Sequence, residues 1–150
     1  KMLQDFHGKV PFMKGMLEAV MNRANSKGVI RTLLGRKCRF DLWEPTQWGV
    51  HKALPLNQAQ TEYGMAIKRA YTYKALNRLI QGSAADQTKK AMVDVYEELG
   101  IVPLIQVHDE LDCSVKDEKQ GKQIKEIMEN CVELEVPSKV DTEINESWGG

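Results

Sequence analysis

Apolar residues first recur at helical spacing near the start of the chain. Between residues 11 and 27 they form a single stripe. Pro11 suits the first position of a helix, and Gly28 suits the position just after the last turn. The pattern therefore predicts a helix over 11–27. From 28 to 43 the period changes, with apolar and β-branched residues on both sides of Leu34-Gly35, which predicts a short two-stranded hairpin.

The middle of the chain predicts a loop followed by two helices. Residues 44–57 contain two prolines, a glycine and an asparagine, which is typical of a loop. A long helical pattern begins at about Gln58, and Gly82-Ser83 interrupts it. A second helix then follows, and Gly100 supplies its end.

The last third predicts a hairpin, an acidic helix and a strand. Ile101–Val107 and Glu110–Val115 have the composition of strands, joined by a tight turn at His108-Asp109. In that register Leu104 faces Cys113 and Val102 faces Val115, which would give an apolar face. A helix is expected at about 117–132, with Ile124, Ile127, Met128 and Cys131 inward, and a final strand at Lys139–Ile144. Hairpins without βαβα alternation predict an α+β fold with an antiparallel sheet.

The composition narrows the class of protein. The chain has 150 residues, 42% hydrophobic and 28% charged, which is typical of a globular protein with a real core. No apolar run approaches the roughly 20 residues that cross a bilayer, so we expect a cytoplasmic protein without a membrane partner. Its three cysteines include no C-x-x-C pair, and we expect reduced, mostly buried thiols rather than disulfides or a zinc site.

The zero net charge conceals an asymmetry along the chain. Residues 1–90 carry 16 Lys and Arg against 6 Asp and Glu, whereas residues 91–150 carry 5 against 15. A basic half suits a polyanionic partner, and an acidic half suits a site for divalent cations. The alternative is two solvated faces that neutralise each other.

The turn of the second hairpin is the first candidate for chemistry. It places the adjacent carboxylates of Asp109 and Glu110 beside His108. Mg²⁺ prefers oxygen ligands and is typically held by one or two carboxylates together with substrate phosphates. The alternative is a solvated acidic turn without a function.

The stretch before that hairpin is the second candidate. Asn77 and Gln81 are one helical turn apart and share a face, which Lys74 and Arg78 flank. Such donors suit the minor groove of DNA, where the acceptors look much alike for every base pair. Gly82 would let a nucleic-acid strand or another backbone approach closely. The alternative is a polar stripe on an amphipathic helix.

Taken in order, these segments resemble a known family. TLLGRKCRF (32–40), LNRLIQGSAADQTKKAM (76–92), IQVHDELDCSV (105–115) and LEVPSKVDTEINESW (134–148) follow one another as at the C-terminus of family A, polymerase I-like DNA polymerases. The Gln-Gly-Ser-Ala-Ala-Asp helix followed by Gln-Val-His-Asp-Glu-Leu is highly specific. The resemblance implies an antiparallel palm-type sheet with a catalytic hairpin and packed helices, part of a polymerase hand.

The resemblance also implies roles for individual residues. Asp109 would be one of two metal-ligating aspartates, Glu110 a further carboxylate at the same Mg²⁺ site, and His108 a contact near the primer terminus. DNA-binding residues would be Asn77, Gln81, Lys74, Arg78, Arg36 and Arg39. Two departures stand out: Lys37 replaces a second arginine of the family's Thr-x-x-Gly-Arg-Arg hairpin, and Tyr73 stands where many relatives have an arginine. Lys74 is then the candidate to supply that charge.

One half of the expected metal site does not occur in the sequence. The family takes its other aspartate from an upstream strand resembling Asp-Tyr-Ser-Gln-Ile-Glu, and nothing like it occurs here. We therefore expect residues 1–150 to be a partial palm with adjoining fingers helices that acts on primer–template DNA and dNTP together with an upstream polymerase segment or chain. We expect it to be inactive alone, and to work in a bacterial or phage-infected cell. The alternative is a noncatalytic DNA-binding module or a decayed remnant.

Overall fold

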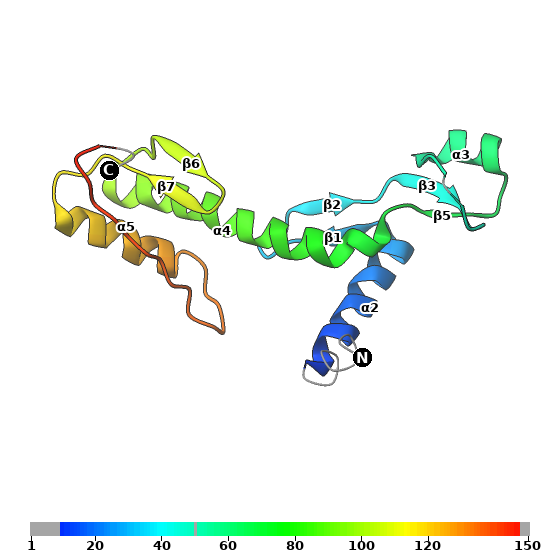
Figure 1. Cartoon of the computed structure of the whole chain (residues 1–150), viewed down its shortest axis with the longest axis horizontal. Helices are drawn as coiled ribbons and strands as arrows, with labels where there is room; N and C mark the ends of the chain where they lie inside the picture. The colour runs from blue at the N-terminus through cyan, green and yellow to red at the C-terminus, as the bar shows by residue number, and fades with distance from the viewer. Residues whose placement is uncertain (1–9, 50, 148–150) are drawn as a thin grey trace. The chain divides into compact units, whose positions relative to one another are not determined.

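The computed structural model describes residues 10–49 and 51–147 and divides the chain into two compact units (Figure 1). The units are Lys1–Gly82 and Ser83–Gly150, and we call them the basic and the acidic unit. The basic unit carries 14 Lys and Arg against 5 Asp and Glu, whereas the acidic unit carries 7 against 16. The charge asymmetry of the sequence therefore follows the division of the structure.

The basic unit begins with the predicted helix. α2 (Pro11–Lys27) has Pro11 in its first turn and ends at Gly28, whose φ of 67° is left-handed. The amide of Gly28 donates to the carbonyl of Ala24 at 3.0 Å. A side chain at Gly28 would also meet the guanidinium of Arg69 at 2.5 Å. Both the backbone conformation and the close approach therefore require glycine here.

The first hairpin is confirmed. β1 (Val29–Arg31) pairs antiparallel with β2 (Lys37–Arg39), with Ile30 opposite Cys38. Ile30 is buried together with Ala24, Phe40 and Ala75. The core of this unit therefore joins α2, the hairpin and the start of the long helix that follows.

The prediction for residues 44–74 was wrong in part. The structure has a small antiparallel sheet of order β4-β3-β5, formed by β3 (Leu42–Pro45), β4 (Leu54–Pro55) and β5 (Ile67–Arg69). α3 (Leu56–Tyr63) is short and ends at Gly64. Trp43 pairs with Arg69 in the sheet, and the guanidinium lies 4.5 Å from the Trp43 ring centroid. This pairing joins residues far apart in sequence and overrides the local helical pattern.

The predicted break at Gly82-Ser83 was also wrong. After a 3₁₀ turn at Thr72–Lys74, α4 (Ala75–Leu99) runs without interruption through both residues. A side chain at Gly82 would lie 2.7 Å from Cγ2 of Thr32. Gly82 therefore reflects close packing of the first hairpin on α4, and not the end of a helix.

The acidic unit contains a short second hairpin. β6 (Ile105–Val107) pairs with β7 (Glu110–Asp112), with Val107 opposite Glu110, and the amide of Leu104 donates to the carbonyl of Asp112 at 2.8 Å. The strands are shorter than predicted, but the register agrees. The predicted apolar face is not buried, because Leu104 is 70% and Val102 is 61% exposed.

The acidic helix is confirmed and the last strand is not. In α5 (Glu118–Asn130) the side chain of Asp117 caps the first turn by accepting from the amide of Gln120 at 2.8 Å. Ile124 is buried, as expected for an inward residue. Residues 139–144 form no strand, and the amide of Val140 donates instead to the Glu129 carboxylate on α5 at 3.0 Å.

The α+β class with antiparallel sheets is confirmed. Among the helices described, none has the length and apolar character that a membrane crossing requires.

Candidate catalytic hairpin and candidate nucleic-acid interface

The tip of the second hairpin presents its carboxylates to solvent. Asp109 and Glu110 are both exposed, and His108 has a φ of 54°. A non-glycine residue in this left-handed region is uncommon, although histidine tolerates it better than most. The carbonyl of His108 accepts a hydrogen bond from the side-chain amide of Gln106, which ties the turn to β6. The strained turn thus holds two adjacent carboxylates at the end of a paired ribbon.

These two carboxylates fit part of a Mg²⁺ site. Within residues 10–49 and 51–147 no group of three or more His, Cys, Asp or Glu could hold a metal ion. Asp109 and Glu110 still supply the hard, exposed oxygen atoms that Mg²⁺ prefers, and this ion commonly keeps waters and substrate phosphates as its other ligands. The hairpin can therefore contribute ligands but does not form a complete cage.

Asp112 is a carboxylate that the sequence did not single out. One carboxylate oxygen, Oδ2, is buried and has no hydrogen-bond partner among the described residues. Leaving such an atom unpaired costs about 1–3 kcal/mol, and more when it is charged. The alternation of the strand gave no sign of this burial.

The candidate DNA-contacting residues lie in the basic unit. Asn77 and Gln81 are exposed on α4, one turn apart, as predicted. Arg36 donates from Nη2 to the carbonyl of Gly82 at 2.8 Å, so its guanidinium lies beside the turn that carries Gln81. Arg39 is exposed on β2. The structure therefore brings the first hairpin and the polar face of α4 together.

The turn between β1 and β2 packs against α4 at Gly82. Thr32 is buried, and its amide and hydroxyl donate to the carbonyl of Arg36 at 3.0 and 3.3 Å. Arg31 donates to the carbonyl of Gly35 at 2.9 Å. Because Gly82 has no side chain, Thr32 and Arg36 can approach it closely. The sequence predicted that either a nucleic-acid strand or another backbone would lie close to Gly82. In the structure the residues close to Gly82 belong to this hairpin.

Two of the basic residues predicted to bind DNA, Lys74 and Arg78, lie against aromatic rings. The guanidinium of Arg78 lies 5.0 Å from the ring centroid of Phe40, and Arg78 is half-buried. The ammonium of Lys74 lies 5.2 Å from the ring of Tyr71 and 5.6 Å from the ring of Tyr73. Cation–π contacts of this kind contribute about 0.5–1 kcal/mol at exposed sites. They favour the positions that both cations have in the structure.

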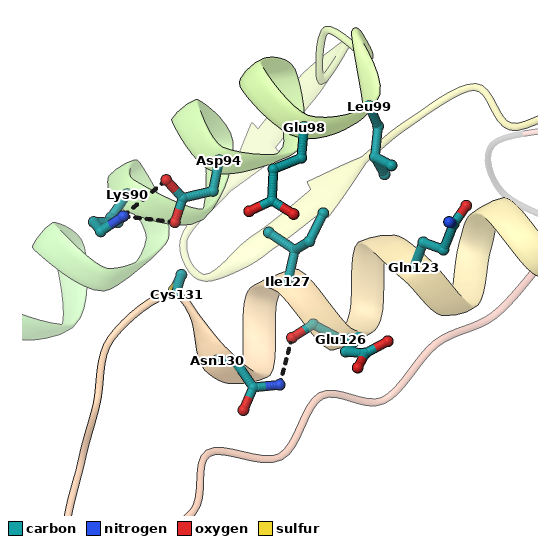
Figure 2. A pocket seen from close by; sticks show the side chains of 9 residues that line it. All are labelled: Lys90, Asp94, Glu98, Leu99, Gln123, Glu126, Ile127, Asn130 and Cys131. Carbon is teal, nitrogen blue, oxygen red and sulfur yellow. Dashed lines mark hydrogen bonds and ion pairs between the residues drawn. The ribbon is translucent and has the colours of Figure 1, made fainter.

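A groove in the acidic unit has a structural explanation. A cavity of about 620 Å³ lies between α4 and α5 (Figure 2). On its wall Lys90 is paired with Asp94, with Nζ to carboxylate distances of 2.8 and 2.7 Å, and this hydrogen bond raises the pKa of Lys90. Asn130 donates to the carbonyl of Glu126 at 2.8 Å. Each of these contacts lies within one helix, Lys90 with Asp94 on α4 and Asn130 with Glu126 on α5.

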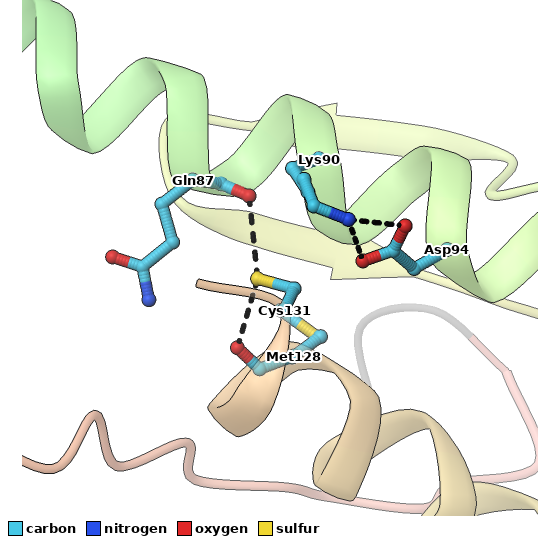
Figure 3. A network of polar contacts seen from close by, with 5 residues as sticks. All are labelled: Gln87, Lys90, Asp94, Met128 and Cys131. Carbon is cyan, nitrogen blue, oxygen red and sulfur yellow. Dashed lines mark hydrogen bonds and ion pairs between the residues drawn. The ribbon is translucent and has the colours of Figure 1, made fainter. Parts of the chain in front are cut away.

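The thiols of Cys113 and Cys131 in the acidic unit are not activated. Sγ of Cys131 lies 3.6 Å from the carbonyl of Gln87 and 3.4 Å from that of Met128 (Figure 3). Burial, and secondarily the Asp94 carboxylate, raises the pKa of the Cys131 thiol. Burial, and secondarily Asp112, raises the pKa of Cys113 in the same way. All three cysteines are half-buried, which is less burial than the sequence predicted, and the raised pKa values of Cys113 and Cys131 argue against a nucleophile at these two positions.

Comparisons with known proteins bear on the whole chain. The family model for DNA polymerase family A matches residues 1–150. The chain belongs to DNA polymerase family A. It is 43% identical to a DNA-directed DNA polymerase of Pseudomonas phage M6, over 99% of this chain and 19% of the phage protein. It is 28% identical to the thermostable DNA polymerase I of Thermus aquaticus, over 97% of this chain and 16% of that protein.

A solved polymerase structure agrees with the fold. The POL domain of Pol1 from M. smegmatis, in complex with DNA primer-template and dNTP, matches with a TM-score of 0.63 and 29% identity over 90% of this chain and 22% of that one. This family A chain therefore spans about a fifth of the length of its relatives. The matched part of the polymerase domain corresponds to the helices and small antiparallel sheets described above.

Proposed function

We propose that this chain is the C-terminal part of a family A DNA polymerase, a partial palm with adjoining fingers helices, and takes part in nucleotidyl transfer from dNTP to a primer 3′-hydroxyl. The observation that carries the proposal is the exposed Asp109-Glu110 pair on the strained hairpin tip, in a chain that matches the family over its full length. Polymerase activity in the relatives supports this reaction class.

In this proposal the hairpin supplies oxygen ligands and orientation. Asp109 and Glu110 would hold Mg²⁺, with Asp109 as the main ligand. When bound, a pair of such ions supplies Lewis-acid stabilisation of the attacking and leaving oxygens. His108, fixed by its backbone conformation and by the hydrogen bond from Gln106, would contact the primer terminus. None of these side chains needs to form a covalent bond with the nucleotide.

The basic unit would hold the primer–template duplex. Asn77 and Gln81 can donate to minor-groove acceptors that nearly all base pairs present, so the contact would not depend on sequence. Arg36, Arg39, Lys74 and Arg78 would contact phosphates. Because Arg36, Lys74 and Arg78 already have contacts within the basic unit, they would lose less side-chain entropy on binding DNA.

The active site would be completed by another segment of the polymerase. The sequence contains no second strand-end aspartate motif, and the relatives are about five times longer. We propose that the other aspartate and the triphosphate-binding fingers helix come from the segment that precedes these residues in the relatives, on the same chain or a partner chain.

A chimera tests this function directly. Residues 1–150 would replace the matching segment of the phage M6 polymerase, and primer extension with Mg²⁺ would be measured. We expect extension in the chimera and a loss of at least about 100-fold in Asp109→Asn, because a metal ligand that stabilises transition-state charge is removed. Asp117→Asn, which keeps a helix-capping side chain, is the matched control and should leave extension unchanged.

Three results would contradict the proposal. Unchanged extension in the Asp109→Asn chimera would exclude a metal role for the hairpin. Asp109-dependent extension by the 150-residue chain alone would show a complete site and overturn the requirement for another segment. A chimera that binds primer–template but never extends it would favour a noncatalytic module or a decayed remnant.

A further inference from the structure

An aromatic and basic cluster precedes α4 in the basic unit and has no structural task that explains its exposure. Tyr73 is 61% exposed and Tyr71 36%. The ammonium of Lys74 lies 5.2 and 5.6 Å from the centroids of their rings. Two rings and one cation are thus gathered within four residues, on the surface of the more basic unit.

The backbone at this cluster is strained. Tyr71 has a φ of 60° and a ψ of 15°, in the left-handed region that a bulky residue rarely adopts. Its carbonyl accepts from the amide of Lys74 at 3.0 Å, which closes the turn. Such strain costs on the order of 1–3 kcal/mol and concentrates at sites that bind ligands. A glycine or asparagine at this position would avoid much of it.

The cluster is continuous with the proposed duplex-binding face. Tyr73 lies in the 3₁₀ turn Thr72–Lys74, which leads directly into α4 at Ala75, and Asn77 and Gln81 follow near the start of that helix. The cluster therefore adjoins the start of α4, next to the residues proposed to contact the duplex.

We propose that Tyr71, Tyr73 and Lys74 form a stacking platform for an unpaired nucleotide of a DNA strand. The exposed Tyr73 ring stacks on the base, Tyr71 holds Lys74 in place, and the Lys74 ammonium faces the phosphate. Proteins that bind single strands combine aromatic rings and positive charge in this way, because every base has a π-face. Charge complementarity with the basic unit favours a nucleic acid over an apolar partner. This proposal rests on the proposed binding of DNA by the same face.

Fluorescence anisotropy of the 150-residue chain with four DNA probes tests the platform. The probes are a blunt duplex, the same duplex with a single-stranded overhang, the same overhang made of abasic nucleotides, and a single strand alone. We expect the normal overhang to tighten binding about tenfold over the blunt duplex, and the abasic overhang, which keeps its phosphates, to lose most of that gain. Tyr73→Ala should remove the gain, whereas Tyr73→Phe should keep it.

Tyr96→Ala is the matched control, because Tyr96 is 58% exposed but lies in the acidic unit. It should bind all four probes like the wild type. If the wild type binds the abasic overhang as tightly as the normal one, or if Tyr73→Ala keeps the full gain, the platform is overturned although duplex binding stands. Tyr73-dependent binding of the single strand without duplex binding would support the platform and contradict the duplex face. Binding of no probe would overturn both.

Discussion

At the scale of single residues, the unusual backbone positions coincide with the candidate chemistry. The non-glycine residues with a left-handed φ, among those described, are Tyr71 and His108. One begins the aromatic cluster before α4 and the other begins the turn that carries Asp109. Histidine tolerates this conformation better than most residues, whereas tyrosine does not, and glycine or asparagine would adopt it at lower cost than tyrosine. Tyr71 is therefore the more unusual of the two positions.

The sequence could identify only some of these residues. His108 and the carboxylates follow a specific motif and were predicted. Tyr71 was not, because its side chain is ordinary and only its φ is unusual. Arg69 was also missed: it donates to the carbonyls of Asn25 and Phe40, at 3.2 and 2.8 Å, and no local pattern reports contacts across 44 and 29 residues.

The half-buried thiols give a prediction for pH dependence. Thiolate is the reactive form, and the raised pKa values of Cys113 and Cys131 keep both protonated near neutral pH. At about pH 8 we expect both to react with iodoacetamide more slowly in the folded protein than in urea, as peptide mass spectrometry would show. Because the folded pKa lies above the ordinary value of 9.0, the stability from these thiols is present below that value and lost as the pH rises through the folded pKa.

Cys131→Ala provides the control for this behaviour. Its melting temperature should fall less between about pH 8 and pH 10 than that of the wild type, since the variant has no thiol at this position to ionise. Equal alkylation rates in the folded and unfolded states would contradict the raised pKa values.

At the scale of elements, close packing at one glycine explains an error in the sequence interpretation. A glycine inside a helical pattern indicates either the end of the helix or a close contact with another element. The sequence alone cannot distinguish these two cases, because it does not show which residues pack against the glycine. In α4 the opposing atoms belong to Thr32 and Arg36, about 50 residues earlier. The β4-β3-β5 sheet was missed for the same reason, because its pairing joins residues that are distant in sequence.

Gly82→Ala should therefore destabilise the basic unit. The new Cβ would lie 2.7 Å from Cγ2 of Thr32, which is a buried, β-branched residue that cannot move aside easily. Overpacking costs about 1–3 kcal/mol, and the better helix propensity of alanine returns about 1 kcal/mol, so we expect a net loss of about 1 kcal/mol. Urea unfolding measures it.

Gly121→Ala is the comparison on α5. Its new Cβ would meet Cδ1 of Ile144 at 2.9 Å, which is the far end of an exposed side chain, and Cγ1 of the same residue at an ordinary 3.7 Å. The helix propensity should dominate there, and the variant should be as stable as the wild type or more so by up to about 1 kcal/mol. If Gly82→Ala were equally well tolerated, the tight approach of Thr32 would not exist in solution.

At the scale of the whole molecule, charge is divided in the same way as the structure. The basic unit has an excess of nine positive charges, 14 against 5, and the acidic unit an excess of nine negative charges, 7 against 16. The sequence predicted this asymmetry, though not the position of its boundary, because the division falls inside a continuous helix. Nothing in the helical period of α4 marks that point. An acidic unit repels DNA unless its carboxylates are neutralised, so binding should depend on the basic unit and on salt.

Salt dependence separates the two kinds of contact proposed for that unit. Binding of primer–template should weaken steeply as salt increases, because each neutralised phosphate adds about 0.9 to the slope of log K against log salt. Arg39→Gln should lower the slope by about that amount, since Arg39 is an exposed cation on β2. Asn77→Ala should weaken binding at every salt concentration and leave the slope unchanged, because an amide releases no counterion.

Lys119→Gln is the control, because Lys119 is an exposed cation of the acidic unit. It should alter neither the affinity for primer–template nor the slope. A slope that falls as much in Lys119→Gln as in Arg39→Gln would mean that DNA does not distinguish the two units, and that the division of charge has no part in binding.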